Sequence, residues 1–421
     1  MFSQLYEKLR PLGVKAYYSG LYPLMLKSRA RAIGKKDRIE VVFFAFNLAM
    51  WRYQGVYDLL SKDKRFNCHI VFTVTRNKNG KIASELQPLR EYFSSRGIPY
   101  VDYDDNTPEG YNVKELINPD ILFYTQPYAY MYPANHDFFL FKDKLLCYIP
   151  YGFFIVENDH ELYDLPYHNL AWKIYCPFLN DKKKAKAVSR NSGLNWVVSG
   201  YHLLDQYNRQ DTLDVWKIKD RKVKRLIWAP HFTLTKVSWI EAQSNFLWMS
   251  QLMLDVAERY KDRLQIAFKP HPRLISELYL HPDWGKERTD NYYQRWASME
   301  NTQVETGEFV DLFKTSDAMI HDSGSFSVEY LFVNKPVAFV KTDMAFNKAG
   351  YTNIGSAALD QHYIVHNEQE VTAFIDDVVL GGNDPMSSQR TEFCNTVLRP
   401  DVTDSPSQFI VNDIKKGLGL A

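Results

Sequence analysis

The segment DAMIHDSGSFSVEYLFVNKPVAFVK, residues 317–341, predicts how the second half of this 421-residue chain folds. An apolar run at Ala318–Ile320 is followed by a small-residue turn at Ser323–Ser325 and an amphipathic stretch over 326–332. An Asn-Lys-Pro break then leads into a second apolar run, Val337–Val340. Strand, turn, helix and strand in this order are typical of a parallel α/β sheet. We therefore expect a βαβ unit here, with the Ser/Gly turn at the carboxyl end of its first strand.

The turn after this strand has the composition of an anion site. The free N–H groups of a helix start, together with two hydroxyls, would converge where the helix dipole is positive. An alternative is that Ser323 and Ser325 only cap the helix. The candidate binding residues of this turn are Asp322, Ser323, Gly324 and Ser325.

Two further apolar runs end in proline-histidine loops. The run 264–268 leads through Lys269 into Pro270-His271-Pro272-Arg273, and the run 226–229 leads into Pro230-His231. Prolines fix the backbone beside each imidazole, and ligands of open α/β sheets collect at the carboxyl ends of strands. His271, His231, Lys269 and Arg273 are therefore candidate site residues. The alternative for each histidine is a hydrogen-bonded structural role in its loop.

Three motifs, WAPHFT, FKPHPRL and IHDSGSFSVEYLFVNKPVAFV, occur in this order from Leu226 onward. They resemble the carboxyl half of the CDP-glycerol glycerophosphotransferases, the teichoic-acid-type polyol-phosphate transferases, and the similarity extends to about Val371. The resemblance implies a GT-B architecture: two Rossmann-like domains facing across a cleft, with the nucleotide donor held by the second. It also implies that His271 and the Ser323/Ser325 turn hold the donor diphosphate.

The chain departs from the family pattern in places that bear on catalysis. His231 stands where the family has Thr, and Gly324 separates the two serines. The family's Trp-His-Gly element, with the His that is its candidate base, corresponds here to Tyr148–Gly152, which lacks that His. A base must be a His or a carboxylate within reach of the acceptor hydroxyl. The candidates are Glu157, Asp159 and His160, with His168 a further one; the alternative is a solvated acidic loop.

The expected reaction is attack by an acceptor hydroxyl on the distal phosphorus of a CDP-polyol, with release of CMP. The acceptor would be a cell-surface glycan or a lipid-linked molecule. The alternative enzyme is a GT-B glycosyltransferase using a CMP- or UDP-linked sugar in capsule or surface polysaccharide synthesis. A third hypothesis is a non-catalytic binding or scaffold protein. We expect no cofactor and no obligatory metal, because no Asp-x-Asp pair follows a strand and no His/Cys cluster has ligand spacing.

Shifts in composition predict the domain boundaries, and the resemblance implies the acceptor and donor roles of the two large domains. We expect a basic amphipathic segment at 1–36, an acceptor-side Rossmann-like domain at 37–207, a linker at 208–225, a donor-binding Rossmann-like domain at 226–385, and a tail at 386–421 that braces the first domain. The first domain begins with the apolar run Val41–Phe46, which no Gly-x-Gly-x-x-Gly follows, so this half is not expected to bind a dinucleotide.

Composition narrows the partners and the compartment. The chain has 51 basic and 50 acidic residues, so its net charge does not favour nucleic acid. Its four widely spaced cysteines are typical of buried thiols in a reducing compartment. With no signal peptide or membrane-spanning run, we expect a cytoplasmic protein. Residues 1–36 carry eight basic side chains against one acid among many Leu and Tyr, which suits the inner face of an anionic plasma membrane; the alternative is a packed helix with a solvated basic edge.

Overall fold

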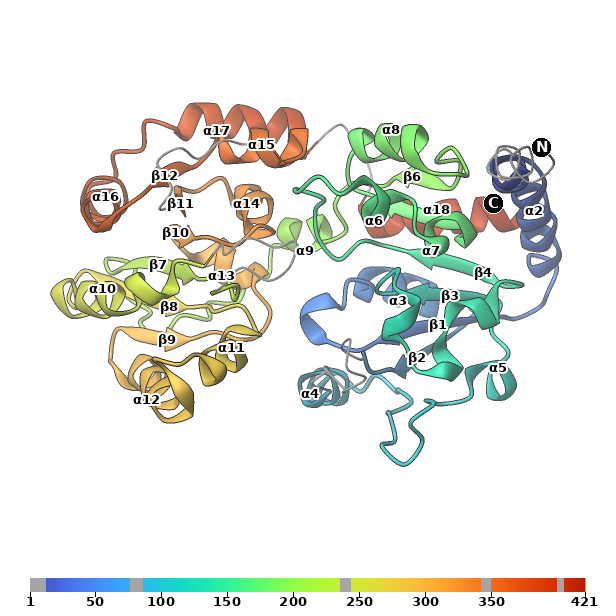
Figure 1. Cartoon of the computed structure of the whole chain (residues 1–421), viewed down its shortest axis with the longest axis horizontal. Coiled ribbons are helices and arrows are strands. Elements are labelled where there is room, and N and C mark those ends of the chain that lie inside the picture. The colour runs from blue at the N-terminus through green and yellow to red at the C-terminus, as the bar shows by residue number, and fades with distance from the viewer. Residues whose placement is uncertain (1–12, 76–85, 235–243, 342–349, 400–404, 421) are drawn as a thin grey trace, which may run out of the picture. The chain divides into compact units, whose positions relative to one another are not determined.

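A computed structural model describes residues 13–75, 86–234, 244–341, 350–399 and 405–420 (Figure 1). The chain forms two compact units. The first unit comprises Met1–Phe153, Asn158–Asp205 and Asp401–Ala421, and the second comprises Phe154–Glu157 and Gln206–Pro400. Each unit contains one six-stranded sheet in which every paired strand is parallel. The prediction of two α/β units is therefore confirmed.

The sheet of the first unit has the order β2-β1-β3-β4-β5-β6. Its strands are β1 (Ile39–Ala45), β2 (Phe66–Phe72), β3 (Ile121–Tyr124), β4 (Leu145–Tyr148), β5 (Lys173–Cys176) and β6 (Trp196–Val198). The expected first strand is thus confirmed as β1, of which six of the seven residues are buried. A single parallel bridge from Val71 to Val101 continues the sheet beyond β2.

Helices surround this sheet. They are η1 (Tyr17–Leu21), α2 (Tyr22–Ile33), η2 (Leu48–Met50), α3 (Gln54–Ser61), α4 (Gln87–Ser95), α5 (Val113–Leu116), η3 (Ala129–Met131), η4 (Ala134–His136), η5 (Phe138–Phe141), α6 (Asp159–Tyr163), α7 (Pro166–Leu170), α8 (Leu179–Val188), α9 (Leu204–Asn208), at the border with the second unit, and α18 (Pro406–Leu418). Figure 1 shows the end of α18, in red, reaching the dark blue α2, and α18 also contacts α3. The carboxyl-terminal helix therefore belongs to the first unit.

The sheet of the second unit has the order β12-β11-β10-β7-β8-β9. Its strands are β7 (Lys224–Ala229), β8 (Leu264–Phe268), β9 (Thr302–Val304), β10 (Ala318–His321), β11 (Val337–Val340) and β12 (Tyr363–Val365). The chain fills one side of β7 first and then the other, so the order reverses between β7 and β10. Ligands of such sheets bind outside the carboxyl ends of the strands at this switch point.

An aromatic core supports the sheet of the second unit. Trp228 of β7 stacks on Phe246 and Phe268, with ring centroids 5.8 and 5.0 Å away, and Trp296 lies 5.5 Å from Trp228. The helices are α10 (Phe246–Arg259), α11 (Leu274–Leu280), α12 (Gly285–Ser298), α13 (Val310–Thr315), α14 (Phe326–Glu329), η6 (Tyr330–Val333), α15 (Asn353–Leu359), α16 (Glu368–Ala373), η7 (Phe374–Leu380), α17 (Ser387–Phe393) and η8 (Cys394–Leu398). Buried rings of this size fix the strands that carry the edge loops.

The unit boundaries differ from those expected from composition. The stretch 208–225 is not a free linker: Trp216 is 1% exposed and donates its indole N–H to Thr315 Oγ1 at 3.0 Å. Residues 386–399 do not join the first unit, because Arg390 pairs with Asp384 and Arg399 donates to Phe332 O at 3.0 Å. The second unit therefore starts earlier and ends later than expected. Among the described residues, no helix combines the length and apolar character that crossing a bilayer requires.

Candidate functional site

The loops that follow β7, β8 and β10 meet at the carboxyl edge of the second sheet. The backbone N–H of His271 donates to Pro230 O at 3.0 Å, and the rings of His231 and His271 have centroids 5.2 Å apart. The backbone N–H of His231 donates to Asp322 Oδ1 at 2.6 Å. The three predicted loops thus form one connected surface, and two of them flank the switch point between β7 and β10.

Asp322 holds this edge together. Its side chain is buried, and Oδ2 accepts the backbone N–H of Asn245 at 2.5 Å while Oδ1 accepts that of His231. The Asn245 amide adds a 3.3 Å bond to Oδ2 and a 3.1 Å bond to Val340 O. Burial raises the pKa of Asp322 to about 6, against the lowering effect of these N–H donors. Both carboxylate oxygens of this predicted donor-binding residue are therefore used to position the loops.

The two edge histidines share one hydrogen-bond arrangement. His271 Nδ1 accepts the backbone N–H of Arg273 at 3.1 Å, and His231 Nδ1 accepts that of Thr233 at 3.4 Å, with Thr233 Oγ1 2.8 Å away. Burial lowers the pKa of His271 to about 3 and that of His231 to about 4. Both rings are therefore neutral at pH 7. Because Nδ1 accepts in each, the ring hydrogen lies on Nε2, and each imidazole presents an N–H donor.

The serines of the turn after β10 do not cap the following helix. Ser325 occupies the N-cap position of α14 without a side-chain capping bond, and the described residues give the hydroxyls of Ser323 and Ser325 no hydrogen-bond partner. The capping alternative is therefore wrong for Ser325. His321, a buried residue of β10, sets the path of the turn: its Nδ1 lies 3.2 Å from Ser323 N and 3.0 Å from Ser323 O.

The glycine at position 324 is explained by packing against Ile155. A Cβ atom at this position would lie 2.7 Å from Cδ1 of Ile155. Ile155 belongs to the segment Phe154–Glu157, which is held in the second unit by bonds from Thr352 N to Ile155 O at 2.9 Å and from Glu157 N to Gly350 O at 2.7 Å. The residue between the two serines must therefore be small, and Glu157 lies two residues from the contact with the turn.

The predicted cations of the edge occupy different environments. Lys269 is buried and donates to Gly307 O at 2.9 Å, so it supports the loop after β9. Arg273 is exposed, stacks 4.1 Å from the centroid of the Phe232 ring, and pairs with Glu277 at 2.9 Å. Only Arg273 of these two presents its charged group to solvent at the edge.

The candidate bases lie in both units. Glu157 is an exposed residue of the second unit, whereas Asp159 and His160 belong to α6 of the first. Asp159 pairs with Lys184 at 3.0 Å, and His160 is exposed. His168 is buried and accepts the N–H of Leu165 at 3.1 Å, and burial lowers its pKa to about 3. His168 thus has a structural role in α7.

Sequence reasoning missed Asn245, Phe232 and the positioning role of His321. Asn245 lies 77 positions from Asp322 and follows a stretch without periodicity, so no local signal marks it. Phe232 lies in the quoted WAPHFT motif, and its ring centroid is 4.4 Å from that of His271. The described residues contain no group of three or more His, Cys, Asp and Glu side chains arranged to hold a metal ion.

The fold and the edge geometry define an α/β protein of two Rossmann-like units. No family model matches the chain, and no curated protein matches it by sequence. Solved structures share its fold. Staphylococcus aureus MnaA in complex with UDP aligns with a TM-score of 0.61 and 15% identity over 91% of this chain and 98% of that chain. The wall teichoic acid polymerase TagF aligns with a TM-score of 0.56 and 13% identity over 100% of this chain and 98% of that chain. UDP-GlcNAc 2-epimerase from Neisseria meningitidis bound to UDP-GlcNAc aligns with a TM-score of 0.53 and 14% identity over 90% of this chain and 100% of that chain. The chain has the GT-B class of fold, as the sequence predicts.

Proposed function

We propose that the second unit binds the diphosphate of a CDP-activated polyol and that the protein transfers the polyol phosphate to an acceptor hydroxyl. The observation that carries this proposal is the meeting of three loops at the switch point, where the rings of His231 and His271 have centroids 5.2 Å apart. Each Nδ1 accepts a backbone N–H, which leaves Nε2–H as the free donor of each ring. The hydroxyls of Ser323 and Ser325 and the guanidinium of Arg273 add donors at the same edge. Phosphoryl transfer depends on positioning and charge stabilisation, which donors of this kind supply.

In the proposed step the oxygen of the acceptor hydroxyl attacks the phosphorus that bears the polyol. A new oxygen–phosphorus bond forms, the bond to the bridging oxygen breaks, and CMP leaves. The hydroxyl proton goes to a base, and we assign this role to Glu157 because its segment packs against Gly324 of the turn. The first unit would bind the acceptor, a glycan or a lipid-linked hydroxyl compound.

The edge motifs support the choice of reaction over other GT-B chemistries, and the shared fold is compatible with it. The three edge loops carry the motifs that resemble the polyol-phosphate transferases, and the fold is shared with a wall teichoic acid polymerase along the whole chain. The fold is also shared with proteins whose structures contain UDP or UDP-GlcNAc, so a nucleotide sugar is the competing donor. We also propose that the protein works in the cytoplasm at the inner face of the membrane, because residues 1–36 are basic and rich in Leu and Tyr.

The test uses the full chain with CDP-glycerol, CDP-ribitol, CMP-sialic acid and UDP-GlcNAc. Thermal shift measures binding, and CMP release measures turnover with a glycan acceptor. We expect stabilisation by the CDP-polyols, lost in His271→Ala and Ser325→Ala. Stabilisation by UDP-GlcNAc or CMP-sialic acid alone would instead establish the sugar donor.

The chain offers matched controls for these variants. His281 has the same loop arrangement as His271, its Nδ1 accepting the N–H of Asp283 at 3.2 Å, but it follows α11 and not a strand. Ser298 is an exposed serine bonded to its own helix at Arg295 O. His281→Ala and Ser298→Ala should bind donor as the unmodified chain does; if His271→Ala behaves like His281→Ala, the donor site is elsewhere.

A further inference from the structure

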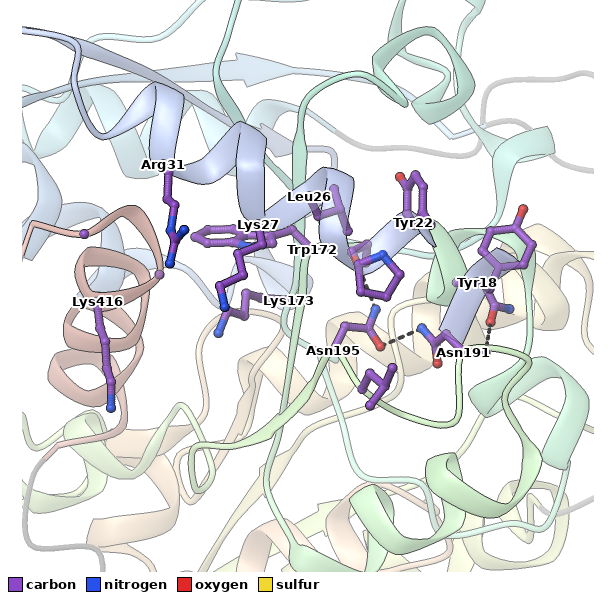
Figure 2. Close-up of a pocket in the computed structure, with 16 residues that line it drawn as sticks. Tyr18, Tyr22, Leu26, Lys27, Arg31, Trp172, Lys173, Asn191, Asn195 and Lys416 are labelled. Carbon is purple, nitrogen blue, oxygen red and sulfur yellow. Dashed lines mark hydrogen bonds between the residues drawn. The ribbon is translucent and has the colours of Figure 1, made fainter. Parts of the chain in front are cut away.

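The first unit contains a pocket of about 490 Å³ at the amino-terminal edge of its sheet (Figure 2). Its walls come from η1 and α2, from the end of α18, and from the loops that lead into β5 and β6. Substrates of open α/β sheets bind at the carboxyl edge, so this pocket lies at the end of the sheet where a substrate is not expected.

The pocket is strongly positive. Lys27 and Arg31 of α2, Lys173 of β5 and Lys416 of α18 line it, and no Asp or Glu does. Lys173 is paired with Asp413 at 2.9 Å, whereas the described residues give Lys27, Arg31 and Lys416 no ion pair. Figure 2 shows the four cations toward one end of the pocket, with Tyr18 and Asn191 toward the other. Three of the four cations thus have no ion pair among the described residues, and like charges gathered in this way attract an anionic ligand.

The walls are fixed before any ligand arrives. Asn195 donates to Ala171 O at 2.7 Å and to His168 O at 2.8 Å, and it accepts from Asn191 at 2.8 Å. Trp172 is buried beneath the cations, and a Cβ at Gly417 would lie 2.6 Å from its ring, so α18 approaches the indole as closely as a glycine permits. A preformed pocket of this kind binds at low entropic cost.

Exposed apolar side chains lie on the helical segment that carries two of the cations and on one wall of the pocket. On the helical segment, Leu21 is 56% and Leu24 is 65% exposed, and Met25 is exposed as well. At 3.6 residues per turn these three point away from the buried Tyr22 and Leu26, with Lys27 and Arg31 on the flank between the two faces. Leu194, 60% exposed, stands on the loop that forms another wall of the pocket. Apolar side chains beside cations are typical of surfaces that lie in the membrane interface.

We propose that this pocket binds the phosphate of an anionic lipid headgroup, while Leu24, on the helix face next to Lys27 and Arg31, and Leu194, on the pocket wall, enter the acyl boundary. The cations supply the charge, and the Trp172 and Tyr22 rings supply walls for the glycerol part of the headgroup. The proposal assigns a lipid site built from three separate parts of the chain, and it does not rest on the transfer reaction, whose donor edge lies in the second unit.

The test is co-sedimentation of the full chain with phosphatidylcholine vesicles with and without phosphatidylglycerol. We expect binding to the anionic vesicles only. The triple variant Lys27→Gln, Arg31→Gln and Lys416→Gln should bind about a hundredfold more weakly, since each cation near an anionic surface contributes about fivefold. All three side chains are exposed, so circular dichroism should show an unchanged fold.

The matched control is Lys62→Gln with Lys64→Gln, two exposed lysines of the same unit that do not line the pocket. The affinity of this control for anionic vesicles should fall less than threefold. An equal loss of vesicle affinity in both variants would mean that the protein is attracted to the membrane diffusely, without a binding site. Equal binding to neutral vesicles would mean that the anionic headgroup is not recognised. Calorimetry with soluble glycerol phosphate distinguishes a lipid headgroup from a free phosphate compound. If the chain binds glycerol phosphate through Lys27 and Arg31 but does not bind vesicles, the pocket serves a free phosphate and the lipid proposal is wrong.

Discussion

The carboxylate of Asp322 receives the backbone N–H of Asn245 at 2.5 Å, across 77 positions of the chain. The second oxygen receives the N–H of His231. One buried side chain therefore joins the strand that carries the Ser323 turn to the loop that carries an edge imidazole and to the start of α10. The shape of the edge depends on this residue before any ligand is considered.

The first prediction concerns that brace. Asp322→Asn keeps the shape but turns one acceptor into an NH₂ group that faces a backbone N–H, leaving a buried donor without an acceptor. We expect a loss of about 1–3 kcal/mol in the free energy of unfolding, together with weaker donor binding. Urea unfolding measures the first and thermal shift with CDP-glycerol the second. As a control, Asp311→Asn, which breaks a surface pair with Arg209, should cost less than about 1 kcal/mol. An equally small loss in Asp322→Asn would mean that the edge loops keep their positions without the Asp322 carboxylate.

Strands β7, β8, β10 and β11 can be predicted from sequence because each contains an apolar run that ends at a proline or a polar break. Val337–Val340, for example, is a strand with those bounds in the structure. The three edge loops can be predicted for the same reason, since parallel strands deliver their following residues to one edge.

Other features cannot be predicted, because they depend on contacts between distant residues. Asn245 gives no sign of its bond to Asp322, and the segment Phe154–Glu157 gives no sign that it joins the second unit. The linker assignment at 208–225 fails because polar composition hides one buried ring, Trp216, among charged neighbours. A single anchoring side chain outweighs the average of its segment.

The second prediction concerns acid stability. Burial lowers the pKa of His271 to about 3, below its ordinary value of 6.5. The unfolded chain therefore binds more protons at this residue between pH 6.5 and 3, and stability falls as the pH falls through that window. At pH 5 the loss relative to pH 7.5 should be about 2 kcal/mol from this residue.

The comparison for this prediction is His271→Gln, which cannot titrate. Between pH 7.5 and pH 5, the free energy of unfolding of this variant should fall by about 2 kcal/mol less than that of the unmodified protein. Buried His136 and His168 keep both proteins acid-sensitive, so the difference between the two proteins is the quantity to measure. Parallel pH profiles would show that His271 is not desolvated.

The third prediction concerns Lys335, the lysine of the Asn-Lys-Pro break. Its ammonium group donates to Lys314 O at 2.6 Å, to Phe313 O at 3.2 Å and to Ser316 O, at the carboxyl end of α13. Lys335→Met removes these bonds and leaves three carbonyls with fewer donors, at a cost of about 2 kcal/mol by urea unfolding. Because these contacts lie at the amino end of the strands, affinity for CDP-glycerol should not change. A large loss of affinity with intact stability would place this lysine in the donor site.

The last prediction uses two glycines that pack against one residue. A methyl group at Gly324 would meet Cδ1 of Ile155 at 2.7 Å, whereas a methyl group at Gly355 would meet the carbonyl oxygen of Ile155 at 2.5 Å. The end of an isoleucine side chain can turn aside, but a backbone carbonyl that accepts the N–H of Thr352 at 2.9 Å cannot move without losing that bond. Overpacking costs about 1–3 kcal/mol, so Gly324→Ala should fall at the low end of this range and Gly355→Ala at or above the high end.

Ile155→Val separates the two cases because it removes the Cδ1 methyl and leaves the carbonyl in place. Combined with Gly324→Ala, it should restore most of the lost stability and donor binding, giving a coupling energy of about 1 kcal/mol in a double-mutant cycle. Combined with Gly355→Ala, it should restore nothing. Additive behaviour in the first pair would mean that Ile155 does not press on the Ser323–Ser325 turn, and the assignment of Glu157 as the base, which depends on that contact, would lose its support.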